Sequence, residues 1–122
     1  MNVYATGASS NHEDIKATII ALEKQALELW NNGNPDGYLE LYSDDIVYFD
    51  PSLEFKLEGK KALVDYYEKA RGLVEIDSYE MVNPVVQSTS EFAVLIFNLI
   101  SYEGTKVHKW NCTEVYKLDS QG

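Results

Sequence analysis

The feature that most constrains this chain is a single change in hydrophobic period, from helical spacing before about Gly72 to strand-like alternation after about Glu75. Apolar residues that recur every three or four positions bury one side of a helix, whereas alternation with period two buries one face of a strand. Because the change happens once and no internal repeat interrupts it, the sequence predicts helices first and an antiparallel sheet afterwards. That order is typical of the α+β class.

Apolar stripes at helical spacing recur in three segments of the first half. We predict helices over about residues 11–32, 34–43 and 60–71. Asn34 followed by Pro35 is typical of an N-cap and a first helical position, and Gly72 can adopt the left-handed conformation that ends a helix. Local residue chemistry therefore agrees with the hydrophobic pattern about where these helices begin and end.

The second half has the alternation and the turn residues of an antiparallel sheet. Strands are predicted over about residues 46–49, 75–87, 91–103 and 105–118. Gly104–Thr105 is a two-residue loop with glycine first, which suits a type II′ hairpin and pairs Glu103 with Lys106. Extending this register brings Asn98 opposite Asn111. The predicted fold class is α+β, with N-terminal helices packed on an antiparallel sheet.

The same register divides the last hairpin into two faces, because side chains alternate along a strand. One face mixes polar groups into an apolar background and carries Asn98, Asn111 and Thr113. The other is almost entirely apolar and carries Phe97, Leu99, Trp110 and Cys112. We expect the helices to cover the polar face and enclose a pocket there. The apolar face would then pair with a second copy in a homodimer, since monomers rarely expose a large apolar patch.

Length and charge limit the domain count and the partners. The 122 residues suit one domain, and we expect a flexible arm over residues 1–10 followed by a single domain over residues 11–122. Ten Lys and Arg residues against 20 Asp and Glu residues give a net charge of −10, and such a surface repels nucleic acid and anionic membranes. No apolar run reaches the roughly 20 residues of a membrane span. We therefore expect neither nucleic acid nor a membrane as a partner.

The cysteine and histidine residues indicate the compartment and argue against a metal site. Cys112 is the single cysteine, so the chain forms no internal disulfide, which fits a reducing compartment. The first ten residues lack the pattern of a secretory signal, and the cytoplasm is the default location. His12 and His108 have no second histidine or cysteine at ligand spacing, so we predict no metal and no cofactor. Cys112 lacks a nearby activating group, which favours an inert thiol.

Asp50 is the candidate catalytic residue. A carboxylate beside a pocket can take up or release a proton as a general base or acid. The alternative is that Asp50 caps the turn before Ser52 and Leu53, since aspartate side chains favour such turns. The residues themselves leave both interpretations open.

Candidate ligand contacts lie on a helix, a short strand and the last hairpin. An amide within the apolar run VLIFNLI costs about 1–3 kcal/mol if it is buried without partners, so Asn98 either pairs with Asn111 or contacts a ligand. Trp30 and Tyr48 either pack in the core or line a pocket. The predicted ligand-binding set is Trp30, Tyr48, Asn98, Asn111 and Thr113. Its expected ligand is small and is either apolar or of mixed polarity.

Two sequence segments carry a resemblance to a known group of proteins. They are NNGNPDGYLELYSDDIVYFDP and EGKKALVDYYEKARG, which span residues 31–51 and 58–72. In this order of elements, a helix ends in Asn-x-Gly, a short helix ends in Tyr-x-Asp-Asp, and a strand ends in Asp-Pro before a glycine and a further helix. The chain thereby resembles the nuclear transport factor 2-like superfamily, above all its SnoaL-like and ketosteroid isomerase-like members, over about residues 15–118.

The resemblance implies a fold and a site. The fold would be a cone in which helices pack against a curved antiparallel sheet and enclose a pocket, with dimers formed through the sheet. In the steroid isomerases, the aspartate of the Asp-Pro pair is the base that moves a proton next to a ketone, and Asp50 matches it. The positions of the family's two oxyanion donors, a tyrosine and an acid, hold Ala26 and Thr113, so both of those donors are missing. The family's usual last strand has no counterpart before the chain ends, which predicts an unpaired sheet edge.

Two functions of different classes follow. The first is a cavity protein that binds a small molecule, with isomerase-like or hydratase-like proton transfer through Asp50 as an extension. The second is a non-catalytic module that senses a ligand or assembles dimers or larger rings. The absent oxyanion donors favour binding, the Asp-Pro pair favours chemistry, and the fold alone does not choose a substrate.

Overall fold

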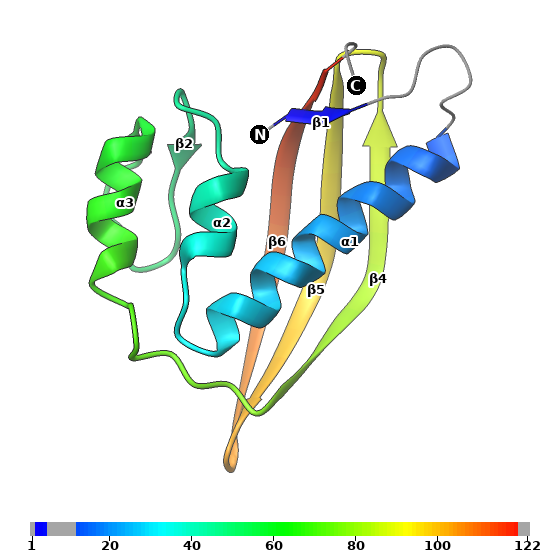
Figure 1. The fold of residues 1–122 in the computed structure, drawn as a ribbon. Helices are drawn as coiled ribbons and strands as arrows, with labels where there is room; N and C mark the ends of the chain where they lie inside the picture. The colour runs from blue at the N-terminus through cyan, green and yellow to red at the C-terminus, as the bar shows by residue number, and fades with distance from the viewer. Residues whose placement is uncertain (1, 5–11, 120–122) are drawn as a thin grey trace. The chain divides into compact units, whose positions relative to one another are not determined.

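The computed structural model describes residues 2–4 and 12–119 and has the α+β order that the sequence predicts (Figure 1). Its contacts divide the described chain into two compact units. One unit holds residues 26–75, and the other holds residues 2–25 and the segment from residue 76 onward. The helix α1 (His12–Asn31) begins in the second of these and ends in the first. The prediction of a single domain over residues 11–122 stays a prediction.

The larger sheet lies in the unit that begins and ends the chain. Its strands are β1 (Asn2–Tyr4), β4 (Ser78–Ser88), β5 (Phe92–Glu103) and β6 (Lys106–Asp119). They are hydrogen-bonded in the order β1-β6-β5-β4, with β4, β5 and β6 antiparallel and β1 parallel to β6. The three long strands confirm the predicted sheet of the second half.

The hairpin between β5 and β6 has the predicted register. Glu103 pairs with Lys106, and Asn98 lies opposite Asn111. Gly104 has a φ of 59°, which glycine adopts without the steric cost of a side chain. The Asp77 carboxylate accepts a hydrogen bond of 2.7 Å from the Gly104 N–H and so holds the turn. A two-residue turn is a local feature, which is why the sequence sufficed to predict this register.

The side of the sheet that α1 covers differs from our expectation. Phe97 and Leu99 are only 4% and 8% exposed, whereas Asn98, Asn111 and Thr113 are exposed. Tyr116, on the Phe97 face, donates a hydrogen bond to Glu23 of α1, so the first part of the helix lies on the apolar face. The expectation that the first helix covers the polar face was therefore wrong.

This reversal has a physical reason and a consequence for the predicted dimer. An amphipathic helix buries more apolar area against the more apolar of two faces, and that difference decides the side. Phe97 and Leu99 are consequently buried within the chain and cannot form the predicted homodimer surface. Of the predicted interface, Trp110 alone is strongly exposed, at 44%, while Cys112 is partly buried.

The strand β1 lies where we expected part of a flexible arm and an unpaired edge. Its residues Asn2–Tyr4 pair with residues 117–119 of β6. The edge of β6 is therefore hydrogen-bonded over that stretch, which limits the pairing of this edge with other chains. The rest of the predicted arm, residues 1 and 5–10, lies outside the described residues.

The other unit contains the short elements. They are α2 (Asp36–Leu41), β2 (Val47–Tyr48), β3 (Leu57–Glu58) and α3 (Lys60–Glu68). The strands β2 and β3 form an antiparallel pair. The sequence did not predict β3, because a two-residue strand is too short to show alternation.

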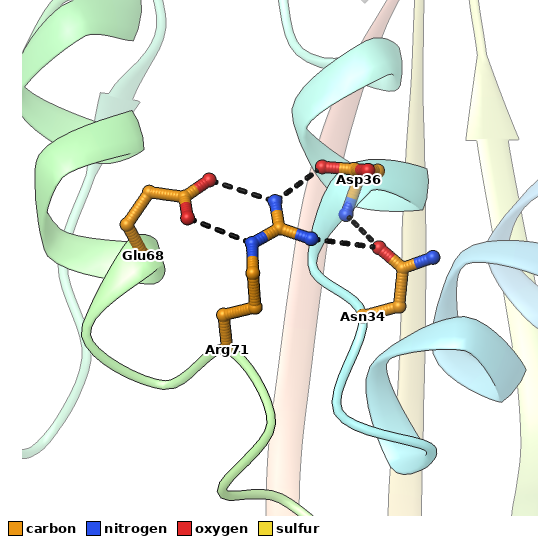
Figure 2. Close-up of polar contacts among 4 residues, drawn as sticks. All are labelled: Asn34, Asp36, Glu68 and Arg71. Atoms are coloured by element: carbon orange, nitrogen blue, oxygen red, sulfur yellow. Dashed lines mark hydrogen bonds and ion pairs between the residues drawn. The ribbon is translucent and has the colours of Figure 1, made fainter.

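Arg71 ties the end of α3 to the start of α2, as Figure 2 shows. Its guanidinium donates two hydrogen bonds of 2.7 Å to Glu68 and also binds Asp36. The N-cap residue of α2 is Pro35 rather than the predicted Asn34, and the Asn34 side chain accepts a hydrogen bond of 2.9 Å from the Asp36 N–H just before the helix. These groups are half exposed, so solvent screens the ion pairs and their effect is mainly geometric.

No helix in the described part of the chain is both long enough and apolar enough to cross a membrane.

Candidate functional site

The candidate site is centred on the Asp50 carboxylate, which accepts three hydrogen bonds. The Tyr48 hydroxyl donates to Oδ2 at 2.8 Å, and the Tyr66 hydroxyl donates to the same oxygen at 2.9 Å. The Ser52 N–H donates to Oδ1 at 2.8 Å. Two phenols from separate elements thus converge on one carboxylate oxygen, with Tyr48 supplied by β2 and Tyr66 by α3.

The local sequence explains how Asp50 is held. The Leu53 N–H also donates to the Asp50 carbonyl at 3.0 Å, which closes the turn that the Asp-Pro pair predicts. The turn-capping interpretation of Asp50 therefore agrees with the contacts. The Ser52 N–H of this turn occupies Oδ1, and Oδ2 remains for the two tyrosines. A carboxylate has about four lone-pair sites, so these three bonds leave capacity for a further donor.

Burial and neighbouring charge keep both phenols protonated. The pKa of Tyr48 is raised, first by burial and then by Tyr67 and the Asp50 charge. The pKa of Tyr66 is raised as well, by burial and by its hydrogen bond to Asp50. Both tyrosines therefore remain neutral hydrogen-bond donors to Asp50 across the physiological range.

The two tyrosines that bind this carboxylate belong to a cluster of aromatic rings within the same unit. The ring of Tyr67 lies 4.9 Å from that of Trp30 and 5.5 Å from that of Tyr48, measured between centroids. The Tyr48 and Tyr66 rings are 6.1 Å apart. The hydroxyls of Tyr42 and Tyr67 are hydrogen-bonded at 3.1 Å. The structure therefore brings the predicted residues Trp30, Tyr48 and Asp50 into one cluster of contacts.

The other predicted ligand contacts lie in the sheet unit. The Asn98 Nδ2 donates to the Asn111 Oδ1 at 2.7 Å, so the two amides satisfy each other in part. Both amides and Thr113 lie on the exposed face of the sheet. This arrangement agrees with the amide-pair interpretation, and a pocket shared with Asp50 stays a prediction. Their role in binding a ligand stays a prediction.

The sequence analysis did not predict the hydrogen bonds of two polar residues, Tyr66 and Glu23. The helical spacing of Tyr66 is typical of a core residue, but its hydroxyl donates a hydrogen bond to Asp50. Glu23 is fully buried and accepts a hydrogen bond from Tyr116. A signal for Glu23 existed, because it falls on the apolar stripe of α1 four residues after Ile19 and four before Leu27. A carboxylate in such a stripe indicates a buried polar contact.

The described residues offer little to a metal ion or to a thiol reaction. No three His, Cys, Asp or Glu side chains come together as metal ligands in the part of the chain that the structure describes. Burial raises the pKa of Cys112 to about 12, with further contributions from Glu114 and Glu23. A thiol of that pKa is a poor nucleophile at neutral pH, as the sequence led us to expect.

Comparisons with known proteins identify the family of the chain. A family model described as a SnoaL-like domain matches residues 24–122. A solved structure of a candidate ketosteroid isomerase from Parabacteroides distasonis is 46% identical, with a TM-score of 0.77 over 92% of this chain and 82% of that one. A search of curated proteins found no match.

Two more distant structures share the fold. An NTF2-like protein of unknown function from Pseudomonas putida is 19% identical, with a TM-score of 0.73 over 84% of this chain and 75% of that one. The CaMKII hub from S. rosetta is 14% identical, with a TM-score of 0.66 over 84% and 82% of the two chains. Because the family model matches most of the residues and one relative is nearly half identical, the chain belongs to the SnoaL-like domain family of the NTF2-like superfamily.

Proposed function

We propose that this protein binds a small, mostly apolar molecule that carries a polar hydrogen-bond donor, with Asp50 as the acceptor. The observation that carries the proposal is the convergence of Tyr48 and Tyr66 on one oxygen of Asp50, among the rings of Trp30 and Tyr67. Aromatic rings suit an apolar ligand, and a few fixed polar groups orient it. The candidate ketosteroid isomerase at 46% identity supports a ligand of this chemical class.

The hydrogen bonds of Asp50 favour binding over strong base catalysis. Its three hydrogen bonds already occupy most of the acceptor capacity of the carboxylate, which leaves few lone pairs to take a proton from a substrate. Proton abstraction beside a carbonyl also needs donors that stabilise the resulting oxyanion. The positions at which the family resemblance implies those donors hold Ala26 and Thr113, and Thr113 is exposed. Proton transfer through Asp50 is therefore an extension of the proposal. One experiment can separate this extension from binding.

The test measures binding and turnover on the same protein. The probe is a β,γ-unsaturated ketosteroid that also carries a free hydroxyl group as the hydrogen-bond donor. Tryptophan and tyrosine fluorescence measures its binding, and absorbance of the conjugated product measures isomerisation. We expect saturable binding that weakens about tenfold or more in Asp50→Asn, because the amide replaces an anionic acceptor with a neutral one. Asp65→Asn is the matched control, since Asp65 is an exposed carboxylate on α3.

The outcomes separate the two parts of the proposal. Binding without turnover in the wild type supports a binding protein and removes the proton-transfer extension. Turnover that Asp50→Asn abolishes and Asp65→Asn retains makes Asp50 the base. Equal binding by wild type and Asp50→Asn contradicts the proposal, provided that circular dichroism shows both to be folded.

Homodimer formation through the exposed face of the sheet is a second candidate function. Apolar side chains on that face are strongly exposed, with Val115 at 60%, Val85 at 47% and Ile96 at 38%. Val85 of β4 pairs with Ile96 of β5, and Val115 of β6 pairs with Val94 of β5. A contiguous apolar patch of this kind favours association. The CaMKII hub of S. rosetta shares the fold, and the name of that protein describes an assembly role.

The cytoplasm remains the proposed location. The single cysteine, Cys112, supports it, because a protein without an internal disulfide is stable in a reducing compartment. Cell fractionation with an antibody to the protein tests this assignment, and recovery in a secreted fraction would overturn it.

A further inference from the structure

Asp50 has several polar partners but no positively charged one among the described residues. Its carboxylate accepts hydrogen bonds from two phenols and one backbone N–H, all of which are neutral donors. The ion pairs within residues 26–75 are made by Lys56 and Arg71, and both of these side chains bind other carboxylates. The Asp50 carboxylate therefore has no counter-ion in the described part of the chain, and a positively charged ligand can supply one.

The position of Asp50 leaves its carboxylate open to such a ligand. Asp50 and Tyr66 are only partly buried, so a solute can reach the carboxylate from solvent. Oδ2 accepts from both phenols, whereas Oδ1 accepts from one N–H and keeps an unused lone pair. A positively charged N–H group forms a shorter and stronger hydrogen bond to a carboxylate than a neutral donor does. An ammonium group is therefore a better partner for Oδ1 than a hydroxyl group.

The aromatic rings beside Asp50 also favour a cation. The face of a tyrosine or tryptophan ring is electron-rich and attracts a positive group that lies within about 6 Å of the ring centre. Tyr48 and Tyr66 bind the carboxylate directly. Tyr67 connects Tyr48 to Trp30, with centroid distances of 5.5 Å and 4.9 Å. A cation that pairs with Asp50 therefore lies next to electron-rich rings, and these rings also suit an apolar ligand body.

The charge of this unit attracts cations to the site. Residues 26–75 include 11 Asp and Glu residues against 5 Lys and Arg residues. An excess of one sign of charge raises the local concentration of oppositely charged solutes and speeds their association. A ligand with a carboxylate or phosphate group is repelled by the same field. The charge therefore favours an amine over an acid.

We propose that the ligand of this site is a small organic amine whose protonated nitrogen pairs with Asp50 and whose apolar body lies against the tyrosine rings. The inference rests on the proposed function and deepens it, because it gives the polar group of the ligand a positive charge. Asp50 then acts as the counter-ion of that charge.

A matched pair of probes isolates the effect of the charge. Cyclohexylmethylamine and cyclohexylmethanol have nearly the same shape, and each carries a hydrogen-bond donor. The amine is protonated at neutral pH, as a lysine side chain is, and the alcohol is uncharged. Isothermal titration calorimetry measures both dissociation constants. We expect the wild type to bind the amine at least about tenfold more tightly than the alcohol, because a charge-assisted hydrogen bond and a cation–π contact act together.

Two variants test whether Asp50 is the counter-ion. Asp50→Asn should reduce the preference for the amine to about threefold or less, the part that the rings alone supply. Asp65→Asn is the matched control, because it removes one exposed carboxylate from α3 of the same unit and so makes the same change in net charge. This variant should retain the wild-type preference. A preference that Asp50→Asn also retains, with that variant folded by circular dichroism, overturns the assignment.

The outcomes also separate this inference from the proposed function. Equal wild-type affinities for the amine and the alcohol overturn the amine, and the proposed function stands if Asp50→Asn weakens the binding of both. Binding of the ketosteroid without binding of the amine likewise overturns the amine alone. Failure of the amine, the alcohol and the ketosteroid to bind contradicts both proposals.

The wild type alone provides a further readout if Asp50→Asn fails to fold. Carbon NMR follows the side-chain carboxyl carbon of Asp50 while each probe is added. We expect the amine to shift this resonance more than the alcohol does, because a positive charge at hydrogen-bond distance polarises the carboxylate. An amine that binds without shifting the Asp50 resonance contradicts the pairing.

Discussion

Tyr48 and Tyr66 donate to the same oxygen of Asp50 but differ in burial, which separates their contributions to stability. A hydrogen bond to a charged group is worth about 1.5–3 kcal/mol, and less where solvent competes for the partners. Tyr48→Phe should therefore lower the free energy of unfolding by about 2 kcal/mol, and Tyr66→Phe by about 1 kcal/mol. Urea denaturation followed by circular dichroism measures both changes.

The control for these substitutions is Tyr102→Phe, which removes another phenol bonded to a carboxylate. The Tyr102 hydroxyl donates to Glu80 at 2.8 Å on the exposed face of the sheet, where solvent replaces a lost partner. We expect a smaller loss of stability in Tyr102→Phe than in either of the other variants. A loss in Tyr102→Phe that equals the loss in Tyr48→Phe would show that burial at Asp50 has no energetic effect.

At the scale of elements, two glycines determine how the end of α1 meets the end of α3. Gly33 has a φ of 83°, and its carbonyl accepts a hydrogen bond of 2.8 Å from the Gly72 N–H. A Cβ added to Gly33 would lie 3.0 Å from the Gly72 Cα, a backbone atom that cannot move aside. Gly33→Ala should therefore cost about 2–3 kcal/mol of stability, from backbone strain together with the clash.

Gly104→Ala provides the matched comparison, since Gly104 also has a positive φ but its added Cβ meets nothing within 4 Å. We expect a cost of about 1 kcal/mol there, from the left-handed backbone alone. Thermal unfolding of the two variants measures the difference. Equal melting temperatures would mean that the close approach between Gly33 and Gly72 contributes nothing.

At the scale of the whole molecule, the net charge of −10 opposes association, while the apolar patch of the exposed sheet face favours it. Salt screens the repulsion and leaves apolar burial intact, so a homodimer should tighten as the salt concentration rises. Light scattering at tens of micromolar protein measures this. We expect Val115→Lys to dissociate the dimer and Leu73→Lys, which changes an exposed leucine outside the sheet, to leave it intact. A wild type that stays monomeric in high salt would exclude this interface.

The sequence by itself determined the features that depend on near neighbours in the chain. The single change in period placed the helices and long strands, and the Gly104 turn set the register that pairs Asn98 with Asn111. Asp50 predicted the turn that it caps, and Asn34 with Pro35 predicted where α2 begins to within two residues. Each of these features depends on contacts between residues a few positions apart in the chain. The strand register follows from such contacts, because the turn fixes the first pair and the later pairs follow from it.

Only the tertiary structure decided which face of the sheet is covered and which polar groups meet. Alternation divides a strand into two faces, but it does not say on which one α1 lies, so we assigned the wrong face to Phe97 and Leu99. Tyr66 meets Asp50 across 16 residues, and Tyr116 meets Glu23 across 93. Contacts over such separations depend on how much apolar area each packing buries and on the closure of long loops, and no local pattern encodes either quantity.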